Sequence, residues 1–257
     1  MTLKQILIAY QTIVIKELVR TFRIWPQTIL PPAITTALYF LIFGKLVGSQ
    51  ISAVQGYTYM QYIAPGLIMM QVIMNSYVNS SSSFFSMKFQ RNIEELLISP
   101  TPNVIVLLGF VTGSVARGFI VGIIVMCIAL LFTHLTVHHV GLMFLTVLIT
   151  SVFFATAGVI NGIVARNFDD VSWIPSFVLT PLTYLGGVFF SVSMLPGFWQ
   201  KMAMLNPILY LVDLFRYSVL GVQDTNIFFA LVILSIVTAM IFCYALYLIR
   251  YSSRLRN

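Results

Sequence analysis

The sequence predicts an all-α integral membrane protein with six transmembrane helices, and two observations lead to this fold class. Of the 257 residues, 59% are hydrophobic and 8% are charged, and the mean hydropathy is +0.97. Soluble domains carry about 25% charged residues. Apolar runs of roughly 20 residues, the length that spans a bilayer, recur along the chain. These observations exclude a soluble globular protein, and we expect a single transmembrane domain over residues 1–257.

The first segment, residues 1–24, is expected to form an amphipathic helix that lies along the membrane surface. Its apolar residues recur at helical spacing, and basic residues stand between them. A cleaved signal peptide is the competing interpretation. That interpretation is disfavoured because basic residues recur after the apolar stretch and no small-residue cleavage site follows Ile15.

Six apolar runs follow, and each is long enough to cross the bilayer. The expected spans within the bundle are residues 25–47, 59–81, 104–132, 140–165, 171–190 and 227–249. An even number of spans places both termini on one side of the membrane. Ten Lys and Arg residues fall on that side and three on the other, with Arg117 inside a span. The positive-inside rule therefore predicts that both termini and the basic tail, residues 250–257, are cytoplasmic.

Several kinds of chemistry find no support in the sequence. No phosphate-binding loop of the form G-x-x-x-x-G-K-[ST] is present, so we expect no ATPase activity and no bound cofactor. Cys127 and Cys243 lie in apolar runs, where thiols pack as small hydrophobic groups. The histidines at positions 134, 138 and 139 have metal-like spacing but no acid or thiol beside them. The net charge of +7 comes from residues at the ends of apolar runs, which indicates membrane lipid and not nucleic acid.

The segment between spans two and three predicts a short helix outside the membrane. Asn92 is expected to be its N-cap, with Glu95 at the third helical position, and Pro100 and Pro102 end it. Two interpretations stay open for the apolar face of this helix: it docks in a groove on a partner protein, or it packs on lipid headgroups. The apolar face consists of Ile93, Leu96 and Leu97.

The fifth span contains residues that break helices. A broken helix is tolerated in a bilayer only where neighbouring helices or a cavity satisfy its backbone groups. The next two apolar segments, residues 195–205 and 207–221, are too short to span. We expect them to re-enter from the outside as half-helices, forming either a gate at the end of a pathway or a structural plug. The helix-breaking residues are Pro175, Pro181, Gly186 and Gly187.

Ionisable residues in membrane segments are functional candidates. Arg117 is expected either to contact a substrate headgroup, to pair with Asp169 or Asp170, or to snorkel to the cytoplasmic surface. Asp213 and Arg216 stand three residues apart and are expected to pair on one helix face. The complete set of candidates for the pathway or gate is Arg117, Pro181, Tyr184, Gly186, Gly187, Asp213 and Arg216.

Small residues also mark the third span. Its glycines recur about every fourth position, a spacing that lets another helix approach closely. The spacing alone leaves open whether that neighbour belongs to the same chain. The glycines are Gly109, Gly113, Gly118 and Gly122.

Four short motifs resemble the type-2 ABC transporter permease family, in an order and spacing that cover nearly the whole chain. They are RNIEELLISP at residues 91–100, GSVARG at 113–118, PLTYLGGVF at 181–189, and NPILY at 206–210 followed by Arg216 and Tyr217. The resemblance implies the permease subunit of an ABC exporter. In such a complex, two permease chains assemble with two separate ABC ATPase subunits, which use ATP and Mg.

The resemblance also implies a coupling helix over residues 92–99 that contacts the ATPase. Its expected contact residues are Asn92, Ile93, Glu94, Glu95, Leu96 and Leu97, with Glu94 and Glu95 as the polar contacts. The second permease is expected to be a copy of this chain in a bacterial inner membrane, although a heterodimer stays open. The substrate is expected to be amphiphilic, lipid-linked or drug-like, and to move outward.

An ATPase-independent channel or secondary transporter is the alternative function. Secondary transporters often use an intramembrane acid for ion coupling. This alternative is less favoured because no Asp or Glu lies in the core of a predicted span.

Overall fold

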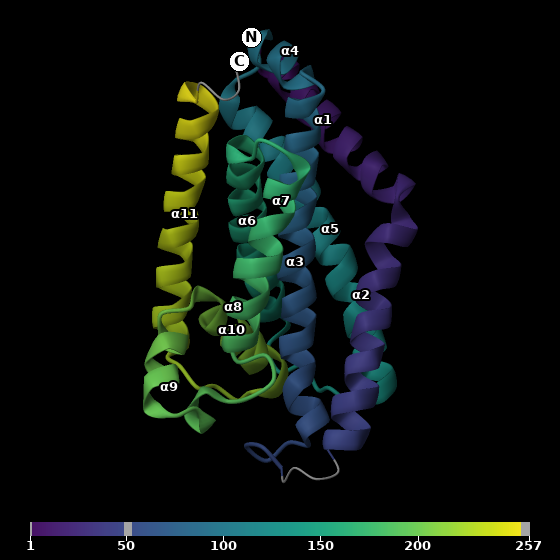
Figure 1. Cartoon of the computed structure of the whole chain (residues 1–257), viewed down its shortest axis with the longest axis vertical. Coiled ribbons are helices and arrows are strands. Elements are labelled where there is room, and N and C mark those ends of the chain that lie inside the picture. Colours follow the sequence, from purple (N-terminus) through teal and green to yellow (C-terminus); the bar gives the residue numbers. More distant parts are fainter. Residues whose placement is uncertain (1, 49–52, 253–257) are drawn as a thin grey trace.

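The structure is a computed structural model that describes residues 2–48 and 53–252 and, within residues 45–47, the backbone alone. The predicted all-helical class is confirmed, because no strand occurs in these ranges. Most of the predicted basic tail, residues 253–257, lies outside the described residues. The long elements run side by side along the longest axis (Figure 1). They are α1 (Leu3–Arg23), α2 (Trp25–Tyr39) with η1 (Phe40–Val47), α3 (Tyr59–Phe89), α5 (Asn103–Phe132), α6 (Val140–Val164) and α11 (Ile227–Tyr251).

Shorter elements occupy two of the connections. The predicted fifth span is divided into three pieces, and the two segments after it are short helices bent by 85° relative to each other. The short elements are α4 (Asn92–Ile98), α7 (Phe168–Ile174), η2 (Pro175–Leu179), α8 (Thr180–Leu185), η3 (Val192–Met194), α9 (Gly197–Met204) and α10 (Pro207–Leu220).

The described part of the chain contains four helical segments that are long and apolar enough to cross a membrane. They are Trp25–Gly44, Asn103–Phe132, Val140–Val164 and Ile227–Tyr251. A fifth candidate arises if the bent pair α9 and α10 is counted as one span. The helix α3 is equally long but carries more polar residues, and the predicted fifth span is interrupted at η2. The protein is therefore a multi-pass helical bundle with four to five candidate spans.

The central element is α3, which lies between α6 and α5 and contacts both of them along much of its length (Figure 1). Close approach to α6 depends on Gly158. A Cβ atom added there would lie 2.2 Å from Ser80 Oγ and 2.4 Å from the Tyr77 carbonyl oxygen. The backbones of α3 and α6 thus lie in direct contact, which allows small polar residues of α3 to be buried.

The glycines of α5 also mark close helix contacts. An added Cβ would lie 2.4 Å from Ile13 Cγ2 at Gly109 and 2.4 Å from Glu17 Cβ at Gly113, so the first two glycines receive α1. At Gly118 and Gly122 the nearest atoms belong to α3, at 2.2 and 2.9 Å. The neighbours are therefore α1 and α3 of the same chain, which answers the question that the glycine spacing left open.

The N-terminal helix α1 crosses the bundle obliquely (Figure 1). It buries Ile13, Glu17 and Thr21, while the apolar side chains of Leu7, Ile15 and other residues are exposed. The start of α1, all of α4 and the end of α11 lie at the same end of the bundle (Figure 1). The buried side of α1 thus includes a carboxylate, which requires polar partners inside the bundle.

Candidate functional site

The predicted short helix between α3 and α5 is confirmed as α4, but its predicted N-cap is wrong. The helix begins at Asn92, and the N-cap residue is Arg91, which has a left-handed backbone (φ 61°) and makes no side-chain cap. The physical reason is the tight reversal after α3, which Arg91 accomplishes through its backbone. The Asn92 amide instead donates to Gln90 Oε1 at 3.2 Å. The helix ends at Ile98, one residue before the predicted end.

The apolar face of α4 points into this chain. Ile93 is 1% exposed and belongs to a hydrophobic cluster with Phe84 and Phe110, against which Leu96 and Leu97 also pack. Ile93 is therefore not available to dock in a partner's groove, whereas Leu96 and Leu97 are half-buried. The burial of Ile93 fixes α4 to α3 and α5, so a displacement of α4 would act on both long helices.

The outward face of α4 is mostly polar. Arg91, Asn92 and Glu95 are exposed, and Glu94 is half-buried. Both carboxylates lie in the first turn, where the helix dipole favours negative charge. Ile98 is 86% exposed and adds one apolar side chain at the other end of this face. A partner protein would thus meet two carboxylates, a guanidinium and one isoleucine.

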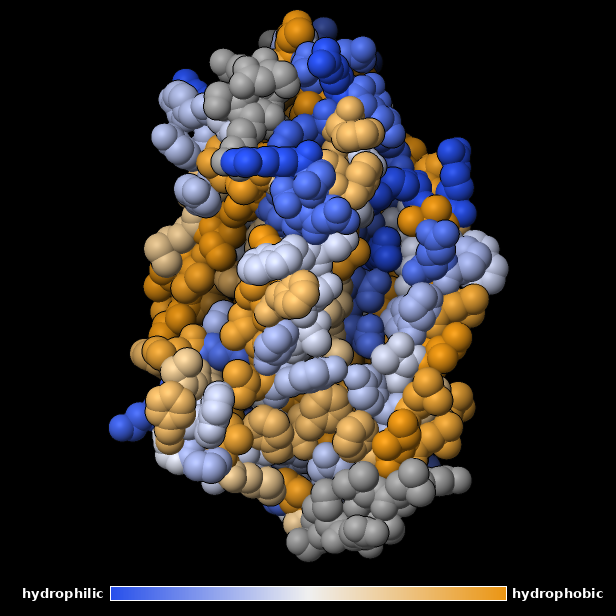
Figure 2. Space-filling view, viewed as in Figure 1, coloured by the Kyte–Doolittle hydropathy of each residue, from blue (hydrophilic) through white to orange (hydrophobic). Residues whose placement is uncertain are grey.

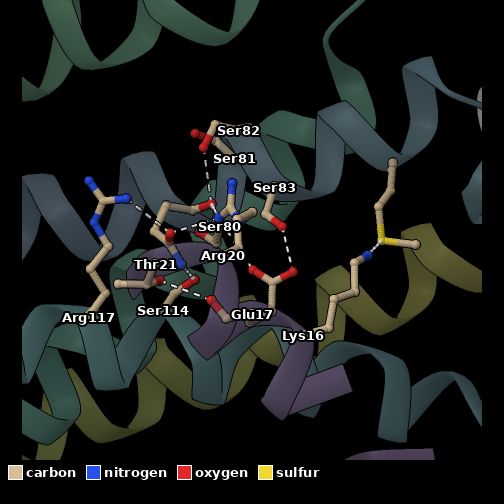
Figure 3. A network of polar contacts seen from close by, with 12 residues as sticks. Lys16, Glu17, Arg20, Thr21, Ser80, Ser81, Ser82, Ser83, Ser114 and Arg117 are labelled. Atoms are coloured by element: carbon tan, nitrogen blue, oxygen red, sulfur yellow. Dashed lines mark hydrogen bonds and ion pairs between the residues drawn. The ribbon is translucent and has the colours of Figure 1, made fainter. Parts of the chain in front are cut away.

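A buried polar network joins α1 to α3 (Figure 3). Glu17 is 0% exposed, and its Oε1 atom accepts a hydrogen bond of 2.7 Å from Ser83 Oγ. Its other carboxylate oxygen forms an ion pair of 3.3 Å with Arg20. Arg20 Nη2 also donates to the backbone oxygen of Asn79 at 3.0 Å and to its Oδ1 atom at 2.7 Å. One acid and one base on α1 are therefore both anchored to α3.

Arg117 joins this network from α5. It is 8% exposed and donates to Asn79 Oδ1 at 3.2 Å and to Asn75 Oδ1 at 3.3 Å. The guanidinium is buried against α3, so Arg117 does not snorkel to the cytoplasmic surface. The predicted pairing with Asp169 or Asp170 is not found either. These acids stand in the first turn of α7 and make no ion pair with Arg117.

Basic groups outnumber acids in the network. Glu17 is the single acid, and three basic residues lie near it: Lys16, Arg20 and Arg117. The Lys16 ammonium donates to Met87 Sδ at 2.6 Å. Burial lowers the pKa of Lys16 below the ordinary value for an amine, while the adjacent Glu17 opposes this shift. Lys16 is exposed, so the positive charge that lies within the bundle comes from the buried Arg117 and the half-buried Arg20, beside the single acid Glu17.

The two asparagines of the network belong to a polar line on α3. Gln71, Asn75 and Asn79 follow one another at four-residue spacing, which places them on one face of the helix. Gln71 and Asn75 are each 8% exposed. Figure 2 shows a hydrophilic column in the furrow between α3 and α2, with apolar surface on the α2 side. The helix α3 thus carries polar groups deep into a bundle that is otherwise apolar.

At the other end of the bundle, the predicted pairing of Asp213 with Arg216 is wrong. Both side chains are 1% exposed but do not form an ion pair. The Asp213 carboxylate accepts hydrogen bonds from the backbone of Asp224 at 2.9 Å and of Thr225 at 2.7 Å, and from Thr225 Oγ1 at 2.5 Å. The loop before α11 therefore satisfies the acid, which leaves no reason for it to turn toward Arg216.

Arg216 instead connects α10 with α3 and with the end of α8. Its Nη2 atom donates to the Gly187 carbonyl oxygen at 2.6 Å, and its guanidinium lies 4.1 Å from the centre of the Tyr62 ring. Gly187 has a φ of +72°, a conformation that favours glycine. A Cβ added at Gly186 would lie 2.7 Å from Ile208 Cγ2. Both predicted gate glycines are thus required by the turn that packs against α10.

The remaining gate candidates lie on the broken span. Pro181 is in the first turn of α8, and Pro175 begins η2. Tyr184 is 40% exposed, and its hydroxyl lies 3.4 Å from that of Tyr39 on α2. The structure therefore brings Gly186, Gly187 and Arg216 together at one end of the bundle, while Arg117 belongs to the separate network at α1.

Comparison with known proteins identifies the family. Residues 8–220 match the ABC-2 type transporter family. The chain belongs to this family. It is 51% identical over 241 residues to the inner membrane transport permease YadH of Escherichia coli strain K12, covering 93% of this chain and 94% of that relative. It is 23% identical over 193 residues to nodulation protein J of Rhizobium leguminosarum bv. viciae, covering 74% of each.

Membership of the ABC-2 family confirms the resemblance that four sequence motifs indicated. Two of those motifs contain central residues of the structure: 113–118 includes Arg117, and 181–189 includes Gly187. The motifs did not reveal Glu17, Asn75 or Asn79. The four-residue spacing of polar residues on α3 was a visible signal for the asparagines, whereas nothing local distinguishes Glu17 from a solvated acid.

Proposed function

We propose that this ABC-2 chain is the permease subunit of an ABC exporter in a bacterial inner membrane, folded as a single transmembrane domain. Family membership supports transport, and the inner membrane follows from the name of the YadH relative. The observation that carries the coupling to ATP is α4, a short helix with a buried apolar side and a polar outer side. Separate ABC ATPase subunits would supply ATP and Mg, and this chain would bind neither.

The proposed topology has six spans and cytoplasmic termini. The spans are α2 with η1, α3, α5, α6, α7 to α8, and α11, while α9 and α10 re-enter from the outside. The location of α4 at the same end of the bundle as the start of α1 and the end of α11 supports an even number of crossings. The excess of Lys and Arg at that end supports a cytoplasmic assignment.

The proposed mechanism begins with a contact between the ATPase and the outer face of α4, to which Glu94, Glu95 and Ile98 contribute. Closure of the two ATPase subunits would move α4, and the buried Ile93 would pass that movement to α3 and α5. The energy would come from the different affinity of ATP for the inward-facing and outward-facing states.

The proposed complex contains two copies of this chain. A furrow with polar residues, such as that between α2 and α3, is costly to expose to lipid and would be covered by a second protomer. The two furrows would then form one pathway for an amphiphilic, lipid-linked or drug-like substrate moving outward.

Affinity purification from the native membrane in mild detergent, with mass spectrometry and an ATPase assay, tests the proposal. We expect a protein with Walker motifs to copurify and to be lost with the double variant Glu94→Lys and Glu95→Lys. The control is Lys201→Glu, a charge reversal at an exposed residue of α9 that should leave the partner bound. Absence of any such partner in several detergents would favour an ATPase-independent transporter instead.

A further inference from the structure

The charge of Arg117 is not balanced by an acid in the part of the chain that the structure describes. Its hydrogen bonds, at 3.2 and 3.3 Å, go to the neutral amide oxygens of Asn79 and Asn75. Its Nε atom is buried without a partner. In the described ranges no carboxylate forms an ion pair with it. A cation that is 8% exposed in a membrane helix is costly unless an anion accompanies it.

A second guanidinium increases the imbalance. Arg20 and Arg117 both donate to the same Oδ1 atom of Asn79, at 2.7 and 3.2 Å, so the two charges lie close together. The one acid of the network does not neutralise both, because Glu17 is already engaged by Arg20 and Ser83. Figure 3 shows the Arg117 guanidinium on the opposite side of Arg20 from Glu17. The network is therefore short of one negative charge beside Arg117.

The arrangement is held in place before any anion binds. The Asn79 amide group donates to Ser114 Oγ at 2.9 Å, and the Asn75 amide group donates to the Gln71 carbonyl oxygen at 3.0 Å. These bonds orient both Oδ1 atoms toward the guanidinium of Arg117. A guanidinium whose direction is fixed loses little entropy when it forms paired hydrogen bonds with a phosphate group.

We propose that Arg117, with Arg20 beside it, binds a phosphate group, and that Asn75 and Asn79 are positioning residues. The phosphate is either the headgroup of a lipid or free phosphate, since the recognition chemistry is the same. The inference rests on the proposed transport function for one step, namely that the bound phosphate belongs to the transported amphiphile. Binding itself requires no ATPase and is measured on this chain alone.

The test uses the purified chain in a neutral detergent, with native mass spectrometry and thermal unfolding as readouts. The probes are phosphatidic acid, diacylglycerol with the same acyl chains, which lacks the phosphate, and inorganic phosphate. We expect phosphatidic acid to bind and to raise the Tm, and diacylglycerol to bind at least about tenfold more weakly, as an order-of-magnitude expectation for the loss of a charged hydrogen bond. An equal effect of inorganic phosphate would identify free phosphate as the source.

Three variants separate this site from general charge attraction. Arg117→Gln should weaken phosphatidic acid binding about tenfold to a hundredfold, and Arg117→Lys should weaken it less. Arg23→Gln removes an exposed charge at the end of α1 and should leave binding within about twofold. Unchanged binding by a folded Arg117→Gln variant, or equal binding of both lipids, would overturn the proposal.

The variant Asn75→Asp keeps the test decisive if removal of Arg117 prevents folding. It places a carboxylate at the position that now contacts Arg117 at 3.3 Å, and so supplies the missing negative charge from within the chain. We expect a higher Tm without lipid and a loss of the phosphatidic acid effect. A variant that still binds phosphatidic acid as the wild type does would contradict the site. Failure to find an ATPase partner would refute the proposed function but would leave these binding results unaffected.

Discussion

At the scale of single residues, Glu17 determines how α1 is attached to the bundle. Replacing Glu17 with Gln removes the ion pair to Arg20 and weakens the hydrogen bond from Ser83. We expect the free energy of unfolding to fall by about 2 kcal/mol, because a charge-assisted contact is lost in a buried place. Thermal unfolding in detergent measures this effect, with the exposed Lys4→Gln as a control. Equal Tm values for both variants would show that α1 is held by its apolar contacts alone.

The sequence identified some of these residues but not their partners. Arg117 was recognisable because a charge in an apolar run is unusual, yet Asn75 and Asn79 lie 42 and 38 positions away in the chain. Such contacts depend on the packing of α3 against α5, which local spacing does not determine. The same limit explains the error at Asp213, whose partners are backbone groups of a loop 11 and 12 residues later.

At the scale of helices, the contact between α3 and α6 depends on the absence of a side chain at Gly158. We expect Gly158→Ala to lower the free energy of unfolding by about 1–3 kcal/mol, because its Cβ would meet Ser80 Oγ and the fixed Tyr77 carbonyl oxygen. Gly141 is the matched control on the same helix, since an added Cβ there meets no atom within 4 Å. Gly141→Ala should leave the Tm unchanged or raise it slightly. A stable Gly158→Ala variant would show that the two helices can separate at little cost.

Substitutions on the two faces of α4 should have different effects: one on the buried face should lower stability, and one on the exposed face should weaken coupling to the ATPase. Ile93→Ala opens a cavity in a packed cluster and should cost about 2–4 kcal/mol of unfolding free energy. Ile98→Ala removes an exposed side chain and should leave the Tm unchanged while it weakens copurification of the ATPase. Thermal unfolding and quantitative pull-down of the two variants check these outcomes. A pull-down that is unaffected by Ile98→Ala would place the partner's contact elsewhere.

Helix positions were more predictable than helix ends. The long apolar runs coincide with α2 and η1, α5, α6 and α11, because hydropathy over about 20 residues is a strong signal. The sequence did not predict the end of the broken span or the start of α4 as well. Arg91 adopts a left-handed backbone because the chain must reverse between α3 and α4, a demand that comes from the packing of both helices.

At the scale of the whole molecule, the position of the furrow predicts where a second copy binds. In Figure 1, α11 and α2 lie at opposite sides of the bundle, and the broken span lies in front, between α11 and α3. The furrow between α2 and α3 is therefore on the side away from α11, and the broken span carries exposed aromatic residues such as Phe177. Polar groups facing lipid are costly, so the side with the furrow should be covered by protein while α11 faces lipid.

Cysteine crosslinking in the membrane tests this arrangement in a background where Cys127 and Cys243 are replaced by serine. We expect Phe177→Cys, at a residue that is 67% exposed, to form a disulfide-linked dimer on mild oxidation. Ile236→Cys on α11 is 53% exposed and serves as the matched control that should stay monomeric. The opposite pattern would place the second copy against α11. The furrow of each protomer would then need a different protein to cover it, and the pathway would no longer be shared between two identical chains.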